Sequence, residues 1–127
     1  MRVGIDLSPL RRESSGGIVQ LMEGLCPALF ERAPDVRFVV YQSRGGSCLS
    51  DALPRNAATV KMPGLPDAAE LDDALASDGV DVLFRPFPVP DDLAFPLSRQ
   101  AILLPDMQHE DCPGFFARAE RSDRSRA

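Results

Sequence analysis

The stretch from residue 105 to residue 116, PDMQHEDCPGFF, gathers the side chains of this sequence that are best suited to do chemistry. It holds the only histidine of the chain, His109, with Asp106, Glu110 and Asp111 close to it in the sequence. An imidazole beside carboxylates can move a proton, bind a metal ion or contact a polar substrate. The same residues can also form a polar loop that only caps the following helix. Which of these roles the stretch has depends on where the fold places it.

The spacing gives little support for a metal ion. A metal site needs three or four ligands that converge, and neither a His-x-x-x-His pair nor a Cys-x-x-Cys pair accompanies His109. The three cysteines are far apart and odd in number, which argues against a disulfide framework and favours a reducing cytoplasm: Cys26, Cys48 and Cys112. We therefore expect no metal and no cofactor. Contact with a substrate and a capping role both remain open for the stretch.

A second candidate site is the glycine pair Gly16-Gly17, which precedes a helical pattern. Glycines let the backbone approach a ligand closely, and the N–H groups at a helix N-terminus attract anions. A phosphate or a sugar hydroxyl would suit this place, and a plain turn is the alternative. The sequence contains neither Gly-x-Gly-x-x-Gly nor Gly-x-x-x-x-Gly-Lys-Ser/Thr. Dinucleotide-binding and P-loop functions therefore lose their main support.

The elements that must position these residues follow from the apolar periodicity. Apolar residues alternate over residues 2–7, which predicts a first strand. Between residues 18 and 30 they recur at spacings of three and four, which predicts a helix that Ser14 or Ser15 can cap. Pro27 lies inside this pattern, so we expect a kink or a shifted boundary there.

The rest of the sequence alternates between strand and helix patterns. Strands are predicted at 36–41, 59–62, 80–84 and 101–104, and a helix from about 66 to 77. The last two strand patterns, VDVLF and AILL, are rich in apolar residues and typical of buried strands. Such an alternation predicts an α/β class: a Rossmann-like parallel sheet flanked by helices. We expect the strand order 3-2-1-4-5 with right-handed crossovers.

In open parallel sheets, ligands bind at the carboxyl ends of the strands, where the strand order reverses. Here this crevice lies between the first and fourth strands. Three segments are expected to meet there: 14–17, 85–90 and 105–112. Arg85 is therefore a candidate for substrate contact, together with the glycine pair.

Composition narrows the class of protein further. The length of 127 residues suits one domain with its own core. A net charge of −5 argues against general affinity for nucleic acid. The final stretch, ARAERSDRSRA, carries four arginines, and its alternating charges are typical of a solvated helix face or a frayed tail. No apolar run approaches the roughly 18 residues of a membrane span, and MRVGIDLSPL lacks the long apolar core of a secretory signal. We expect a cytoplasmic protein with no membrane span.

Three stretches carry a resemblance to a known family. MRVGIDLSPLRRESSGGIVQLMEGL resembles the N-terminus of family 4 glycosyltransferases of the GT-B architecture, where a first strand leads into a Gly-rich turn and the first helix. PDMQHEDCPGFF is similar to the family's His-Asp-Leu-Gln-His segment, which Pro-x-Phe-Phe follows. VDVLFRPFPVP is similar to the strand and the aromatic-proline loop between them. Together these matches span residues 1 to about 120.

The resemblance implies a two-domain enzyme that transfers sugar with retention and without a metal. The N-terminal domain of such enzymes mainly receives the sugar acceptor, and the C-terminal domain binds the nucleotide-sugar donor with a Glu-x7-Glu motif. Residues 1–120 are then expected to form the acceptor-side domain and residues 121–127 a polar tail. The C-terminal donor domain is absent from this sequence, so a donor domain or a partner chain would have to supply the nucleotide sugar as co-substrate.

The resemblance also implies roles for single residues. Asp106 and His109 are the candidate catalytic residues, and Gln108 joins Gly16, Gly17 and Arg85 as candidates for substrate binding. One departure matters for this assignment. The family's histidine just before the aspartate is a proline here, which has no side-chain donor or acceptor, and His109 is the candidate to serve in its place.

A second Glu-x7-Glu pattern and an alternative function also have to be considered. Glu23 and Glu31 form a Glu-x7-Glu, but they lie on the first predicted helix, and we interpret them as a chance match on a solvated face. The alternative function is a non-catalytic α/β binding module that keeps the fold without the chemistry.

Overall fold

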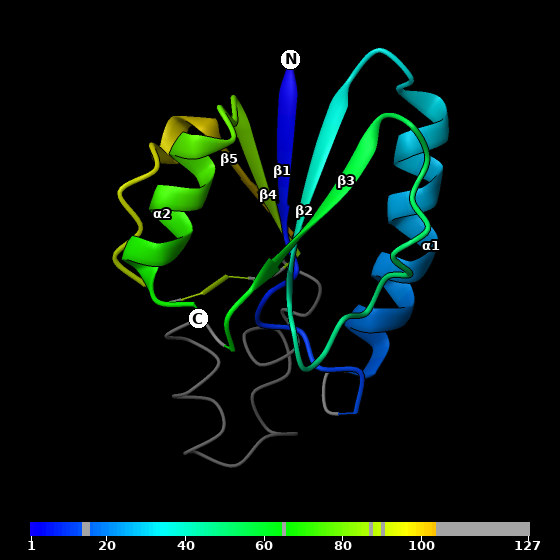
Figure 1. Cartoon of the computed structure of the whole chain (residues 1–127), viewed down its shortest axis with the longest axis horizontal. Coiled ribbons are helices and arrows are strands. Elements are labelled where there is room, and N and C mark those ends of the chain that lie inside the picture. The colour runs from blue at the N-terminus through cyan, green and yellow to red at the C-terminus, as the bar shows by residue number, and fades with distance from the viewer. Residues whose placement is uncertain (14–15, 65, 87, 90, 104–127) are drawn as a thin grey trace, which may run out of the picture.

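The computed structural model describes residues 1–13, 16–64, 66–86, 88–89 and 91–103. Its elements follow the order β1 (Arg2–Asp6), α1 (Gly16–Arg32), β2 (Arg37–Ser43), β3 (Ala57–Met62), α2 (Ala68–Ser77), β4 (Val82–Arg85), η1 (Leu97–Arg99) and β5 (Gln100–Ile102). Five strands form one parallel sheet, with α1 on one face and α2 on the other (Figure 1). The prediction of a Rossmann-like α/β fold is confirmed.

The strand order is β3-β2-β1-β4-β5, as the sequence predicted. The chain moves outward from β1 to β3 and then returns past β1 to β4, so the order reverses between β1 and β4. Ile5 of β1 pairs with Phe84 of β4, and Arg85 pairs with Ile102 of β5. Because all strands run the same way, their carboxyl ends share one edge of the sheet, which lies at the bottom of Figure 1. We refer to it as the carboxyl edge.

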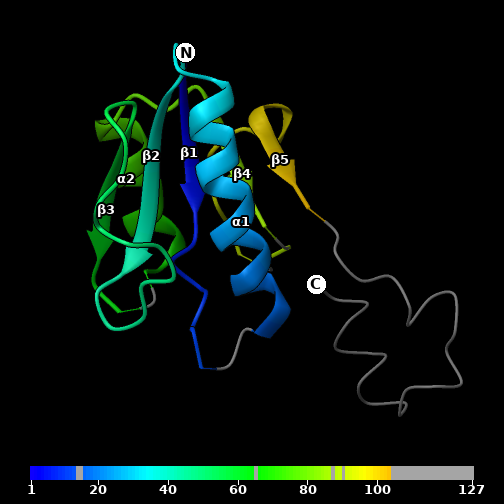
Figure 2. The same ribbon diagram turned by 90° about the vertical axis from the view of Figure 1, so that its right-hand side faces the viewer.

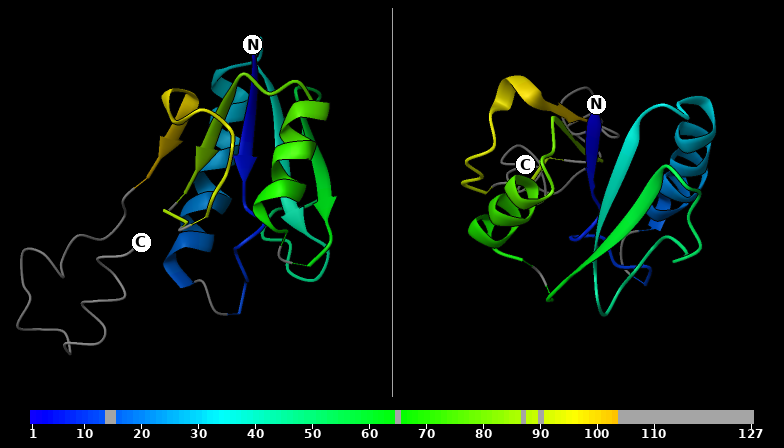
Figure 3. Two further views of the ribbon diagram at one scale, coloured as in Figure 1. Left: turned by 90° about the vertical axis from the view of Figure 1, so that its left-hand side faces the viewer. Right: turned by 45° about the horizontal axis from the view of Figure 1, so that its top comes forward.

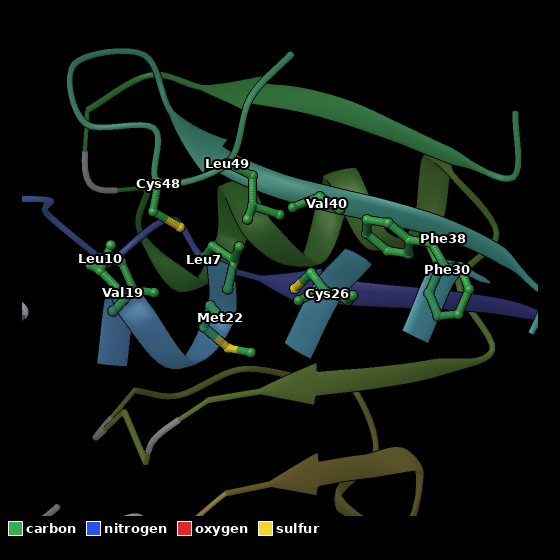
Figure 4. Packing of buried hydrophobic residues seen from close by; sticks show 11 residues of the cluster. Leu7, Leu10, Val19, Met22, Cys26, Phe30, Phe38, Val40, Cys48 and Leu49 are labelled. Carbon is green, nitrogen blue, oxygen red and sulfur yellow. The ribbon is translucent and has the colours of Figure 1, made fainter. Parts of the chain in front are cut away.

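Helix α1 packs on one face of the sheet, and its fully buried side chains form one apolar stripe. Its buried side chains are spaced by three and four residues, and they meet the sheet as shown in Figure 4: Val19, Met22, Cys26 and Phe30. Pro27 lies inside the helix, which nevertheless continues to Arg32. At its C-terminal end, the Asn56 side-chain amide donates hydrogen bonds to the carbonyls of Phe30 and Ala33. This amide satisfies carbonyls that have no partner within the helix. The predicted caps of α1, Ser14 and Ser15, lie outside the described residues.

Helix α2 covers the opposite face, in front of the sheet in the left view of Figure 3. Its start is fixed by a capping box, in which the Asp67 side chain accepts from the Glu70 amide and the Glu70 side chain accepts from the Asp67 amide. Leu71 and Leu75 are its buried residues. Gly4 of β1 lies under this helix, since a Cβ there would approach Leu75 Cδ2 to 3.3 Å.

Two crossovers contain less helix than a doubly wound sheet usually has. Residues 44–56 connect β2 to β3 without a helix. They are held by the buried side chain of Gln42, whose Oε1 accepts from the Leu49 amide at 2.9 Å, and by an ion pair between Lys61 and Asp51 at 2.9 Å. In the described residues of the β4–β5 connection, the only helical element is the three-residue 3₁₀ helix η1.

The prediction that the last strand is buried was wrong. Ala101 and Ile102 are exposed, with 44% of the Ile102 surface accessible. β5 is the edge strand of the described sheet, and no other described helix lies beside α1 on its face of the sheet (Figure 2). The predicted end of this strand at residue 104 lies outside the described residues.

Candidate functional site

A buried ion pair lies at the carboxyl edge, at the point where the strand order reverses. Arg85 is the last residue of β4 and Asp6 is the last residue of β1, and the two strands are neighbours. Arg85 Nη2 lies 3.3 Å from Asp6 Oδ2, and the two side chains are only 4% and 1% exposed. The parallel pairing of β1 with β4 therefore brings together two charges that are 79 residues apart in the sequence.

The proline-rich loop after β4 supplies a second carboxylate to Arg85. Asp91 accepts from Nη1 at 3.0 Å and from Nη2 at 2.6 Å, in a two-pronged contact that fixes the orientation of the guanidinium. The same loop is tied to α2, because the Asp72 carboxylate accepts from the Ala94 and Phe95 amides. The Asp91 contact thus ties this loop to the carboxyl edge, and the Asp72 contacts tie its later residues to α2.

Ser8 completes the group around Asp6. Its hydroxyl donates to Asp6 Oδ1 at 2.6 Å and its backbone amide donates to the same oxygen at 3.1 Å. One oxygen of Asp6 therefore faces Ser8 and the other faces Arg85. We call these four residues, Asp6, Ser8, Arg85 and Asp91, the carboxyl-edge network.

The electrostatics of this network are those of one guanidinium between two carboxylates. Burial alone would lower the pKa of Arg85, but the hydrogen bonds and charges of Asp91 and Asp6 outweigh it and raise this pKa. Arg85 Nε is buried and has no hydrogen-bond partner among the described residues. The network thus favours the charged form of Arg85, while Nε has no partner in the described part of the chain.

The glycine pair lies at the same edge of the sheet. Gly16 begins α1 with a φ of +47°, which a glycine adopts without steric cost. A Cβ built on Gly16 or on Gly17 would meet no atom within 4 Å, so the space beside both residues is open. Figure 1 shows this end of α1 near the carboxyl ends of the strands. The local geometry leaves room for a ligand at this turn.

The structure describes only part of the predicted site. Arg85 lies at the reversal point, as expected, but its side chain is buried and bonded to Asp6 and Asp91. The predicted catalytic residues Asp106 and His109, and the predicted ligand Gln108, lie outside the described residues.

Sequence reasoning missed three members of the carboxyl-edge network: Asp6, Ser8 and Asp91. Two of these residues could have been recognised from their positions in the sequence. Asp6 is a carboxylate at the end of a strand pattern, and Asp91 belongs to a Pro-Asp-Asp run after another strand. A carboxylate at a buried strand end needs a cationic partner, and Arg85 ends the strand predicted to be its neighbour. Ser8 left no comparable signal, because a serine in a loop is common.

A separate groove lies between α1 and the β2–β3 connection. Its volume is about 550 Å³, and its lining combines an apolar floor with the ion pair between Arg12 and Glu23 at 2.5 Å. Glu31 lines it as well, so both residues of the Glu-x7-Glu face one groove. The described residues contain no group of three or more His, Cys, Asp or Glu side chains that could hold a metal ion. No helix in the described part of the chain is long and apolar enough to cross a membrane.

Comparisons with known proteins do not assign the chain to a family. No family model matches the sequence, and neither a curated protein nor a solved structure is significantly similar to it. What is established is therefore the class of protein: a Rossmann-like α/β domain with a buried charged network at its strand reversal point.

Proposed function

We propose that this chain is the acceptor-side domain of a retaining glycosyltransferase. The observation that carries the proposal is the position of Arg85 and Asp6, which form a buried ion pair at the strand reversal point of a Rossmann-like sheet. Ligands of such sheets bind at this point. The sequence resemblance to family 4 glycosyltransferases supplies the chemistry, and the open glycine turn at the start of α1 offers backbone close to the same edge.

In this proposal the carboxyl-edge network shapes the site and does not itself react. The contact between Asp91 and Arg85 holds the proline-rich loop beside the crevice, where a sugar acceptor would bind. His109 and Asp106 are proposed to act on the sugar being transferred. A charged imidazole at His109 would stabilise the negative charge that develops on the departing phosphate.

The donor sugar nucleotide requires a second domain in this proposal. A separate donor domain, joined to this one or supplied by a partner chain, would hold the nucleotide diphosphate and orient its leaving group. We propose a cytoplasmic setting, which suits the odd number of cysteines.

The test joins the chain to the donor domain of a family 4 glycosyltransferase and measures sugar transfer from a panel of nucleotide sugars. Transfer is expected for the joined protein, and none is expected for the chain alone. His109→Ala in the joined protein should lower the turnover rate at least about tenfold, a loss of about 1.4 kcal/mol of transition-state stabilisation. The matched control is Arg55→Ala, which changes an exposed residue.

Two results would count against the proposal. Turnover by the chain alone, above that of a heat-treated sample, would mean that the donor does not need a second domain. An unchanged turnover rate in the His109→Ala protein, with only its thermal stability lowered, would make His109 a structural residue.

The alternative is a non-catalytic α/β binding module, and one observation favours it. The terminal nitrogens of Arg85 are already bonded to Asp6 and Asp91, so the described part of the crevice offers no free guanidinium to a substrate. If the chain bound acceptor glycans but none of the joined proteins transferred sugar, the non-catalytic binding module would be supported.

A further inference from the structure

An entirely apolar groove lies beside α1 on the face of the sheet away from α2. Its volume is about 390 Å³, and residues from β1, β2, β4, β5 and α1 line it. Representative members are Val3, Val82, Phe84 and Ala101 on the sheet and Leu25 on the helix. We call it the α1–β5 groove. No charged side chain lines it among the described residues.

Helix α1 presents this groove with a second apolar stripe. Its first stripe is buried against the sheet, as described above. Leu21, Leu25 and Leu29 follow each other at spacings of four, so they form another row along one side of the helix. Leu25 and Leu29 line the groove, and Leu21 continues the row with 42% of its surface exposed. A helix that needed to cover only the strands beneath it would not require this second row.

The groove is also where no described element covers the sheet. Parallel sheets are normally covered on both faces. Helix α2 and Phe95 of the β4–β5 connection belong to the cluster on one face. On the other face α1 lies alone among the described helices, and β5 stands clear of it in Figure 2. Ala101, which lines the groove from β5, is exposed in the same gap. A further element of the fold would fill this place.

We propose that residues 115–119 of this same chain occupy the α1–β5 groove. The Leu103 amide donates to the Arg85 carbonyl at 3.0 Å, so the chain leaves β5 next to the groove, which Ala101 lines. Residues 104–114 can span up to about 36 Å when extended, which is ample to return to it. Within residues 104–127, Phe115 and Phe116 are the only aromatic residues.

The sequence around these phenylalanines matches a one-sided contact. In a helical period, Phe115, Phe116 and Ala119 share one face, and the residues between them and just after them are mostly charged. A groove without a charged lining fits that apolar face. A second copy of the chain is disfavoured as occupant, because it would leave the aromatic pair without a partner in each copy. The inference does not depend on the proposed function.

The direct test is an isotope-edited NOE spectrum of the full chain in solution. The ring protons of Phe115 or Phe116 should show contacts to the methyl groups of Leu25, Leu29 and Val82. The chain should also elute as a monomer across a hundredfold range of concentration. Absence of these contacts would overturn the proposal. Concentration-dependent dimers with contacts between the Leu25 methyls of two copies would replace it with self-association.

A pair of variants tests independently whether residues 115–119 cover the groove. The double variant Phe115→Ser/Phe116→Ser should open the groove and raise the fluorescence of a bound hydrophobic dye at least about threefold, because an apolar surface is uncovered. The matched control, Arg118→Ser/Arg121→Ser, removes one charge within the segment and one just after it and should leave dye binding unchanged. Equal dye binding by both variants would contradict the proposal. If the phenylalanine variant fails to fold, the NOE spectrum of the native chain decides alone.

Discussion

Arg85 is the residue on which the carboxyl edge depends. A guanidinium buried next to two carboxylates stabilises the fold only while its partners are in place. Asp6 has 1% of its side chain exposed, and among the described residues its other hydrogen bonds come from Ser8. Removing the guanidinium would leave the Asp6 charge buried without compensation.

We therefore expect Arg85→Met to destabilise the chain by about 3–5 kcal/mol, the range for breaking one side of a buried pair. Methionine keeps much of the side-chain length but removes the charge. Urea unfolding followed by circular dichroism would measure the change in the free energy of unfolding.

Arg55→Met is the matched control, because Arg55 is exposed and the change should stay within about 0.5 kcal/mol. A loss below about 1 kcal/mol for Arg85→Met would show that water reaches Asp6 readily and that the network is not a buried unit.

Cys26 makes the stability of the chain sensitive to alkaline pH. Burial raises the pKa of its thiol from 9.0 to about 12, with a smaller contribution from Cys48. The folded state therefore favours the neutral thiol, and its stabilising contribution is complete below pH 9. Between pH 9 and about pH 12 the unfolded chain loses this proton first, so stability falls as pH rises.

Urea unfolding at pH 8 and at pH 10.5 should show a loss of about 1–2 kcal/mol from this thiol. The Cys26→Ala variant is less stable at pH 8 because it leaves a small cavity, but it should lose less stability between the two pH values. An equal pH dependence in the two proteins would mean that Cys26 is not the group responsible.

For single residues, only part of the carboxyl-edge network could be predicted from the sequence. Arg85 was placed at the crevice because it follows an apolar strand pattern. Its pairing with Asp6 joins residues 79 positions apart, and only the observed strand register shows that their side chains meet. The role of Arg85 as a substrate ligand stays a prediction.

At the scale of elements, α2 shows how a local pattern sets a boundary. Its capping box needs only Asp67 and Glu70, three residues apart, and both hydrogen bonds are present at 2.8 and 3.0 Å. Such a pattern is readable in the sequence because it does not depend on distant contacts.

We expect Asp67→Ala to destabilise the chain by about 1 kcal/mol, since it leaves the Glu70 amide without its acceptor. Asp73→Ala on the exposed side of the same helix is the control, and it should be close to neutral. Thermal unfolding of both variants beside the native chain measures the difference. Equal melting temperatures for the two variants would show that water replaces the cap at no cost.

The elements that the sequence predicted poorly are those whose neighbours decide them. The apolar run at 101–104 is typical of a buried strand, yet Ile102 is exposed because β5 is the edge strand of the described sheet. The amino-acid pattern of a strand indicates which face it could bury. Whether that face is buried depends on other elements, which the pattern of the strand does not specify.

At the scale of the whole molecule, one sheet separates two apolar clusters. One cluster lies under α1 and contains Met22, and the other lies under α2 and contains Tyr41 and Leu75. The strand order could be predicted because β-α-β connections are right-handed and the patterns alternate. β1 lies at the centre, paired with β2 on one side and β4 on the other, so both clusters share its backbone.

This shared strand leads us to expect that the two faces unfold together. Tyr41 is the only tyrosine and the chain has no tryptophan, so its fluorescence reports the α2 face. Among the described helices, α1 with 17 residues contributes more to the far-ultraviolet circular dichroism than α2 with 10. In urea, the two signals should have the same midpoint, as in a two-state transition.

Two variants make this expectation sharper. Leu75→Ala changes the α2 face and Met22→Ala changes the α1 face, and each should cost about 2–5 kcal/mol because a fully buried side chain is truncated. In each variant both signals should shift to the same lower midpoint. If Leu75→Ala moved only the tyrosine signal and Met22→Ala only the helical signal, the two faces would be separate folding units, and β1 would not couple them.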